Sequence, residues 1–219
     1  MGGSWAKRAP LTGLVSVVLI VIAFIVGGDS PSPSDSAQEV VDYFSDNEGS
    51  AFVSAILIFY GAVFLVFFAG TLWGVLRRAP GATGRLAAIA LGGGALMALG
   101  IAIFGALAFT LADTHEDLEP AAAQAINALS GDLFFPVALG TVAFTIASGL
   151  AILRGAALPR WLGWAAIVIG VVSLTPAGFF AFLAALLWIA VTSIVLFRSA
   201  PVATEGAAPP PARQPAPGA

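Results

Sequence analysis

Residues 86–112 are LAAIALGGGALMALGIAIFGALAFTLA, a run with no charged side chain, preceded by Arg85 and followed by Asp113. A helix that crosses a bilayer needs about 20 consecutive apolar residues. This stretch therefore predicts a membrane-spanning helix with one basic end and one acidic end.

The same alternation of charge continues along the whole chain. Basic residues precede the first apolar run and follow the second, fourth and sixth, and acidic residues follow the first and third. Glu205 is the one charged residue that breaks this alternation. Lys and Arg are retained in cytoplasmic loops. The pattern predicts that both termini are cytoplasmic and that the acidic segments lie outside. The basic set is Lys7, Arg8, Arg77, Arg78, Arg85, Arg154, Arg160, Arg198 and Arg213.

The composition is that of a membrane protein. Of the 219 residues, 59% are hydrophobic and 10% are charged, whereas soluble domains are about 25% charged. We expect an all-α integral membrane bundle whose main partner is the lipid bilayer, with a membrane-protein partner or a second copy as further partners. The chain has no Cys, which excludes disulfides and thiolate sites. It also lacks the basic patch that nucleic-acid binding requires, so no nucleic-acid partner is expected.

Six transmembrane segments are predicted, at about 11–27, 51–76, 86–112, 133–153, 161–175 and 177–197. The fifth is short, so 161–197 has two alternatives, one long helix or a re-entrant hairpin. Arg160 and Arg198 belong on the same side, which favours two crossings joined by a turn at Thr175–Gly178.

The two ends of the chain carry separate predictions. Residues 1–28 are either a membrane anchor, which we favour, or a signal peptide, because a basic start precedes an apolar run. Residues 1–198 form the predicted membrane domain. Residues 199–219 are rich in Pro and Ala, which predicts a disordered cytoplasmic tail.

Two short amphipathic helices are predicted outside the membrane. Ser36 and Glu39 have the spacing of a capping box, and Ala37, Val40, Val41 and Phe44 follow at helical spacing. Pro120 suits the first position of the second helix, whose apolar face would be Ala122, Ala125, Ile126 and Leu129. Packing over the end of the bundle is the favoured role, and a docking surface for an outer partner is the alternative.

Small residues predict where helices pack closely. Ala90, Gly94, Ala98, Ala102 and Ala106 recur every four residues, so we expect the helix over 86–112 to be the most buried. Gly70 and Gly74 form a GxxxG motif in the helix over 51–76. Packing within the bundle is the favoured interpretation of that motif, and a dimer surface is the alternative.

The residues that carry chemistry are few. Asp113, His115, Glu116, Asp117 and Glu119 are the densest set of potential metal ligands, but their spacing matches no ligand motif, and we favour a solvated acidic loop. No Asp, Glu, Lys, Arg or His interrupts the apolar runs, which argues against a proton or ion pathway. We expect no catalytic residues, no cofactor and no enzymatic activity.

The neutral polar residues suggest one further function. Thr141 and Thr145 share a helix face, and Tyr60 lies within the second apolar run. A mid-membrane cavity reached by these three side chains would favour a carrier or binder of a neutral solute.

The segment Leu158-Pro159-Arg160-Trp161-Leu162-Gly163-Trp164, after Arg154, resembles uncharacterised multi-pass membrane proteins of high-GC Gram-positive bacteria, as do the acidic outer segments. The resemblance implies a multi-pass protein of the cell membrane and no activity. The function expected from the sequence is a non-enzymatic accessory, scaffold or sensor protein, with a carrier or binder of a neutral or lipophilic solute as the alternative.

Overall fold

The computed structural model describes residues 7–32, 34–79, 84–114, 116–132, 134–155 and 158–199, and within these residues it contains helices and no strand. The prediction of an all-helical fold is confirmed. The predicted tail lies outside the described residues from 200 onward, as do residues 1–6. The helices are α2 (Leu11–Gly27), α3 (Ala37–Asp46), α4 (Glu48–Leu76), α5 (Gly84–Thr114), α6 (Pro120–Asp132), α7 (Phe134–Gly155), α8 (Arg160–Val172) and α9 (Gly178–Ser199).

Four helical stretches are long and apolar enough to cross a membrane. They are α4, α5, α9 and the stretch Pro120–Gly155, which contains both α6 and α7. The apolar helices α2 and α8 are shorter, with 17 and 13 residues. The chain is therefore built as a membrane protein.

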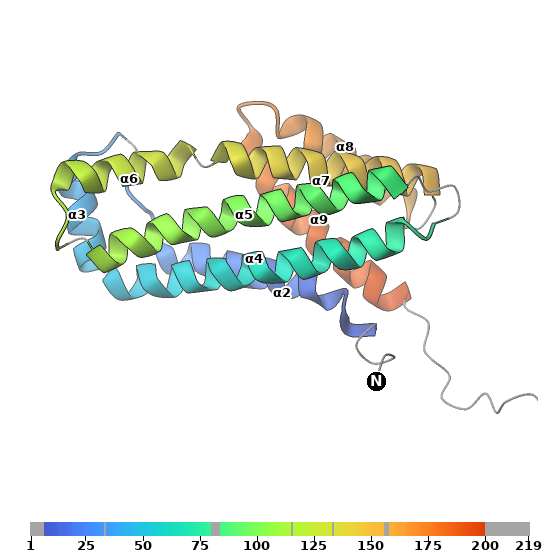
Figure 1. The fold of residues 1–219 in the computed structure, drawn as a ribbon, viewed down its shortest axis with the longest axis horizontal. Helices are drawn as coiled ribbons and strands as arrows, with labels where there is room; N and C mark the ends of the chain where they lie inside the picture. The colour runs from blue at the N-terminus through green and yellow to red at the C-terminus, as the bar shows by residue number, and fades with distance from the viewer. Residues whose placement is uncertain are drawn as a thin grey trace, which may run out of the picture.

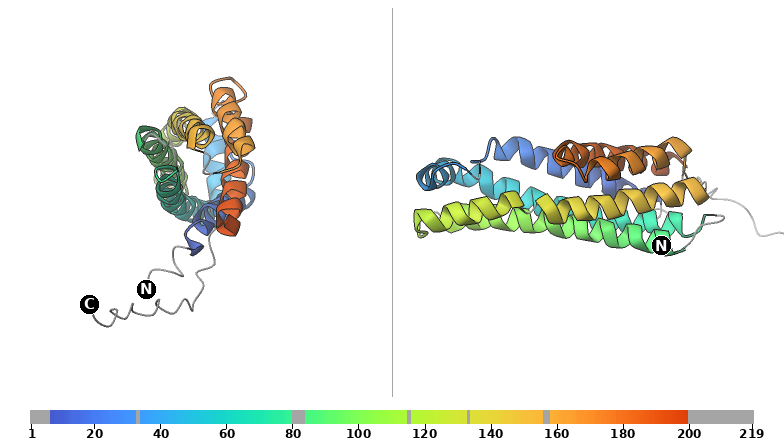
Figure 2. Two further views of the ribbon diagram at one scale, coloured as in Figure 1. Left: turned by 90° about the vertical axis from the view of Figure 1, so that its right-hand side faces the viewer. Right: turned by 90° about the horizontal axis from the view of Figure 1, so that it is seen from above.

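The long helices form a ring. Neighbours around it are α2, α4, α5, α7, α8 and α9, and α9 packs back on α2. Figure 1 shows α3 and α6 at one end of this bundle and the α4–α5 and α7–α8 connections at the other. α6 continues the direction of α7 instead of lying across the end, so the expectation that both outer helices cross the bundle holds only for α3 (Figures 1 and 2).

The hairpin of α8 and α9 covers only part of the bundle. α8 ends at Val172 and α9 begins at Gly178, and the Gly178 N–H donates to the Thr175 carbonyl over 2.9 Å. The turn predicted at Thr175–Gly178 is confirmed. It lies near the middle of the bundle's length (Figure 1), so the hairpin covers the half nearest the α7–α8 connection.

Glycines set the closest helix contact, between α5 and α7. A methyl group on Gly93 would overlap the backbone nitrogen of Phe144, and one on Gly140 would overlap the backbone of Met97. Residue numbers rise along α5 as they fall along α7, so the two helices are antiparallel. Because these positions lack side chains, the two backbones meet directly.

The stripe of alanines and glycines predicted that the helix over 86–112 would be the most buried helix, and the structure shows that it is not. In its most apolar window 39% of α5 is buried, against 44% in α4 and 50% in α9. Ala90, Gly94 and Ala98 are buried, but Ala102 is only partly buried and Ala106 is exposed. A helix has 3.6 residues per turn, so each step of four residues advances about 40° around the axis. The stripe therefore turns away from the packed face before it reaches Ala106.

Two serines join α2 and α4 reciprocally. The Ser16 hydroxyl donates to the Gly61 carbonyl over 2.7 Å, and the Ser54 hydroxyl donates to the Ala23 carbonyl over 2.9 Å. Both serines are buried, at 0% and 8% exposure. The pair fixes the register of the two helices.

Replacing either serine by Ala should lower the free energy of unfolding by about 0.6 kcal/mol, the average for a hydrogen bond between membrane helices. Detergent-unfolding curves of S16A, S54A and the double variant measure this. Thr71 donates only within its own helix, to Phe67, so Thr71→Ala is the control and should change stability less.

The end of the bundle opposite the α4–α5 connection is closed by α3 and α6 (Figure 1), and we call it the outer end. The predicted capping box is confirmed, because the Glu39 N–H donates to the Ser36 hydroxyl and the Ser36 N–H donates to the Glu39 carboxylate. The Glu39 carboxylate accepts hydrogen bonds from the Ser36 backbone N–H and from the Ser36 hydroxyl, and these two bonds, the backbone one first, lower the pKa of Glu39. Val40 and Phe44 are the buried residues of α3.

The apolar face predicted for α6 is not the face that the helix buries. Ala122, Ala125 and Leu129 are exposed and Ile126 is partly buried, whereas Ala123 and Asn127 are the buried residues. Asn127 donates to the carbonyls of Pro31 and Ser32, and Gln124 donates to that of Asp35. Loop carbonyls need donors when they are covered, so α6 turns its amide side chains toward the 31–35 loop.

Candidate functional site

An apolar cavity lies inside the bundle beside the α8–α9 turn. Its volume is about 310 Å³, and five of its eleven lining residues are phenylalanines. We name it the Phe chamber. It is lined by Ile20 and Phe24 from α2, Ile58 from α4, Ile101 and Phe104 from α5, Ser130 and Gly131 from α6, Phe134 and Val137 from α7, and Phe179 and Phe182 from α9.

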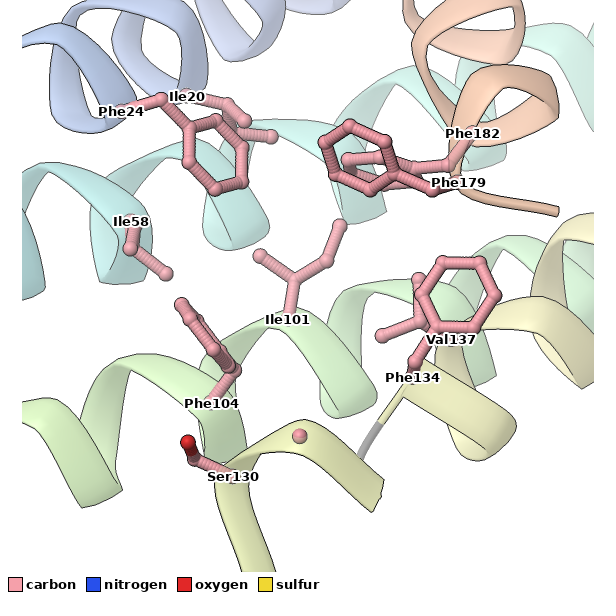
Figure 3. A pocket seen from close by; sticks show the side chains of 11 residues that line it. Ile20, Phe24, Ile58, Ile101, Phe104, Ser130, Phe134, Val137, Phe179 and Phe182 are labelled. Atoms are coloured by element: carbon pink, nitrogen blue, oxygen red, sulfur yellow. The ribbon is translucent and has the colours of Figure 1, made fainter. Parts of the chain in front are cut away.

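The chamber has a buried floor and an exposed rim. Ile20, Ile58 and Ile101 on the floor are 1%, 2% and 5% exposed. At the rim Phe24 is 41% exposed and Phe179 is 51% exposed. Figure 3 shows these rings facing one space from opposite sides. The cavity therefore opens on the flank of the bundle, where α2 and α9 carry the rim.

The short hairpin is the reason for the opening. α9 begins at Gly178, so Phe179 and Phe182 lie in its first turn, three residues apart and on one helix face. Phe134 is likewise the first residue of α7. The chamber thus forms where two helices begin beside the middle of α5.

The lining restricts the chemistry of the chamber. Ser130 is its single polar side chain, and the Ser130 hydroxyl already donates to the Asn127 carbonyl over 2.7 Å. Among the residues that the structure describes, no Asp, Glu, His, Lys or Arg lines the cavity. The chamber therefore offers contact area to an apolar group and no group for acid–base or nucleophilic chemistry.

Two smaller cavities lie next to the chamber, on the side of α3 and α6, and share lining residues with it. One, of about 70 Å³, is bordered by Gly27, Ser30, Tyr43 and Ser54, and the other, of about 180 Å³, by Ser30, Pro31 and Asn127. We name them the outer annexes. Phe104 lines both annexes and the chamber, so its ring separates an apolar space from a more polar one.

Thr141 and Thr145 line none of the four cavities found among the described residues, and Tyr60 lines one that they do not share. Thr141 and Thr145 are buried and donate to the carbonyls of Val137 and Thr141 in their own helix. Tyr60 is 52% exposed and borders a separate groove of about 490 Å³ between α4 and α5. Back-bonding within a helix is common for Ser and Thr in membrane helices, and it leaves these threonines no free donor.

The described members of the acidic set are solvent-exposed and do not form a metal site. Asp113, Glu116, Asp117 and Glu119 are exposed, and His115 lies outside the described residues. Among the residues that the structure describes, no three side chains of His, Asp or Glu approach closely enough to hold a metal ion.

The GxxxG motif faces away from the bundle. A methyl group on Gly70 or Gly74 would meet no atom within 4 Å. Packing within the bundle, the favoured interpretation of this motif, is therefore wrong for these two glycines. Trp188 is 3% exposed, and its Nε1 donates to the Leu162 carbonyl.

Comparison with protein-family models, curated proteins and solved structures found no match.

The Phe chamber was not predicted from the sequence, because its residues come from six separate helices. The available signal was the shortness of the 161–175 segment, which implied a hairpin that does not reach the outer end.

Proposed function

We propose that this protein is a non-enzymatic membrane protein that binds the apolar chain of a lipophilic molecule in the Phe chamber. The observation that carries the proposal is a flank-opening cavity of about 310 Å³ with one polar side chain in its lining. Ligand pockets range from about 300 to 1,000 Å³ and are mostly apolar. This volume lies at the lower end of that range.

The chamber is open to its surroundings at the rim, where Phe24 is 41% and Phe179 is 51% exposed. In a bilayer, an opening between apolar helices meets hydrocarbon chains and not water. The surroundings therefore supply an apolar occupant for the chamber.

Water is a poor occupant. A buried water molecule typically makes about three hydrogen bonds, and the Ser130 hydroxyl is the only polar side-chain group in the lining. An alkyl or isoprenoid chain from the surrounding bilayer needs no such partners and buries its surface against the Phe rings. The lining therefore favours a hydrocarbon chain.

Retention of a ligand tests the proposal. Protein purified in mild detergent should carry about one chain-bearing molecule per chain, since most of the ligand's apolar surface would be buried. Native mass spectrometry detects the complex, and chromatography of an organic extract identifies the molecule. Protein free of such a molecule, whose melting temperature no long-chain compound raises, would contradict the proposal.

We further propose six crossings, with α2 and α8 as the short ones, an extracytoplasmic α3 and α6 cap, and both termini in the cytoplasm of a bacterial cell. The separation of acidic and basic segments supports this orientation. The chain has no Cys, so single cysteines can be placed without background. Cysteines at 46 and 117 should react with an impermeant thiol reagent in intact cells, and cysteines at 79 and 199 only after lysis. The opposite labelling would reverse the orientation.

An accessory or scaffold function is the second candidate. It is supported by Gly70 and Gly74, which leave an unfilled strip on the outside of α4, where another membrane helix or a second copy has room to approach. Disulfide cross-linking through Cys at position 74 tests for a second copy, and blocking the Phe chamber should leave such cross-linking unchanged.

A further inference from the structure

The outer annexes add polar side chains to the site, next to the apolar Phe chamber. They adjoin the Phe chamber at Phe104 and are bordered by polar groups from α6 and the 27–31 segment. A ligand whose chain fills the chamber therefore has room for a head group beneath the α3 and α6 cap. This inference rests on the proposed function.

One polar group there is buried and incompletely bonded. Asn127 is 4% exposed and borders the larger annex. Its Nδ2 donates to the Pro31 and Ser32 carbonyls, over 3.2 and 3.3 Å. Its Oδ1 accepts no hydrogen bond from the part of the chain that the structure describes. A carboxamide oxygen has two lone pairs to offer, so the annex presents an acceptor.

Most other hydroxyls of the annexes already donate within the protein. The Ser130 hydroxyl donates to the Asn127 carbonyl, the Tyr43 hydroxyl to Gly27, and the Ser54 hydroxyl to Ala23. The Ser30 hydroxyl, which borders both annexes, has no bond to the described residues. The annexes therefore suit a head group that both donates and accepts a hydrogen bond, as a hydroxyl does.

The charge around the annexes disfavours an anionic head group. The chain has no Lys or Arg between Arg8 and Arg77 or between Arg85 and Arg154, and these intervals contain α3, α6 and the 27–35 segment. Their ionisable residues are acidic apart from His115 and two tyrosines, as Asp29, Asp35 and Asp132 illustrate. A phosphate or carboxylate would find no cation there and would be repelled.

From this juxtaposition we infer that the ligand is a long-chain alcohol: its hydrocarbon occupies the Phe chamber, and its hydroxyl passes Phe104 and donates to Asn127 Oδ1. One hydrogen bond of ordinary net strength should make the alcohol bind about fivefold more tightly than an alkane of equal length. The matching carboxylate should bind more weakly than either.

The test uses the full chain, stripped of bound lipid and titrated with hexadecanol, hexadecane and hexadecanoate at neutral pH. Apparent dissociation constants come from native mass spectrometry and from melting temperatures, which rise with ligand binding to the folded state. Hexadecanol should bind best and hexadecanoate worst. Hexadecane binding as tightly as hexadecanol, or hexadecanoate binding as tightly as hexadecanol, would overturn the inference. Binding of none of the three would instead overturn the proposed function.

A matched pair of variants locates the hydroxyl. Asn127→Leu should reduce hexadecanol binding to the level of hexadecane and leave hexadecane binding unchanged. Gln124→Leu is the control, because Gln124 also donates to the 31–35 loop, at Asp35, yet borders no cavity described above. It should keep the preference for the alcohol. An equal loss of preference in both variants would contradict a direct bond to Asn127, and if Asn127→Leu does not fold, the ranking on the wild-type chain decides.

Discussion

Replacing Ile101 by Phe should abolish binding in the Phe chamber and raise the melting temperature. Ile101 is 5% exposed and lies on the floor of the cavity, so a larger ring there occupies the space of the ligand. We expect binding of hexadecanol to weaken more than about tenfold, or about 1.4 kcal/mol. Filling a cavity commonly stabilises a protein by about 0.5–2 kcal/mol. Native mass spectrometry and thermal unfolding of lipid-free protein measure the two effects.

The control for this variant is Ile103→Phe on the same helix. Ile103 is 38% exposed and borders none of the four cavities that the structure describes. The substitution adds the same ring to a surface that faces lipid, and it should change neither binding nor stability appreciably. If both variants retained the ligand, the binding site would lie elsewhere on the protein.

Replacing Gly140 by Ala should destabilise the whole bundle. The added methyl group would overlap the backbone nitrogen and Cα of Met97, and a backbone cannot move aside as a side chain does. Forcing one extra carbon into a packed core costs about 1–3 kcal/mol, and we expect a value at the upper end. Gly93→Ala meets the Phe144 backbone from the other side of the same contact and should act similarly. Unfolding in a denaturing detergent measures the change.

Gly92→Ala tests whether the effect comes from that contact. Gly92 is the immediate neighbour of Gly93, but a methyl group on it meets no atom within 4 Å. Ala is favoured over Gly in helices by up to about 1 kcal/mol, so this variant should be as stable as the wild-type chain or slightly more stable. Similar losses in Gly92→Ala and Gly140→Ala would show that the two helices do not approach as described.

Local features were predictable from the sequence because the residues that decide them are neighbours. The capping box of Ser36 and Glu39 and the turn at Thr175–Gly178 each depend on bonds within five residues. Apolar runs bounded by charges likewise identified the long helices. These features need no knowledge of which helices lie side by side.

Features that depend on helix neighbours were not predictable. Gly92 and Gly93 are identical in sequence terms, yet only Gly93 faces α7. Asn127 of α6 is buried because it donates to the Pro31 and Ser32 carbonyls. The spacing of apolar residues along α6 cannot predict where those carbonyls lie. The Phe chamber depends on where along the bundle α8 ends and α9 begins. That position relative to the other helices is known only once the bundle is assembled.

Because the α8–α9 turn lies near the middle of the bundle's length, the hairpin covers one half of the bundle and leaves the other half uncovered. The α8–α9 hairpin lies at the basic end of the bundle (Figure 1), and Phe24 and Phe179 form the exposed rim of the Phe chamber near its turn. With the basic end in the cytoplasm, as proposed, a ligand would enter the chamber on the extracytoplasmic side of that turn. The occupant would then be drawn from the bilayer on that side of the hairpin.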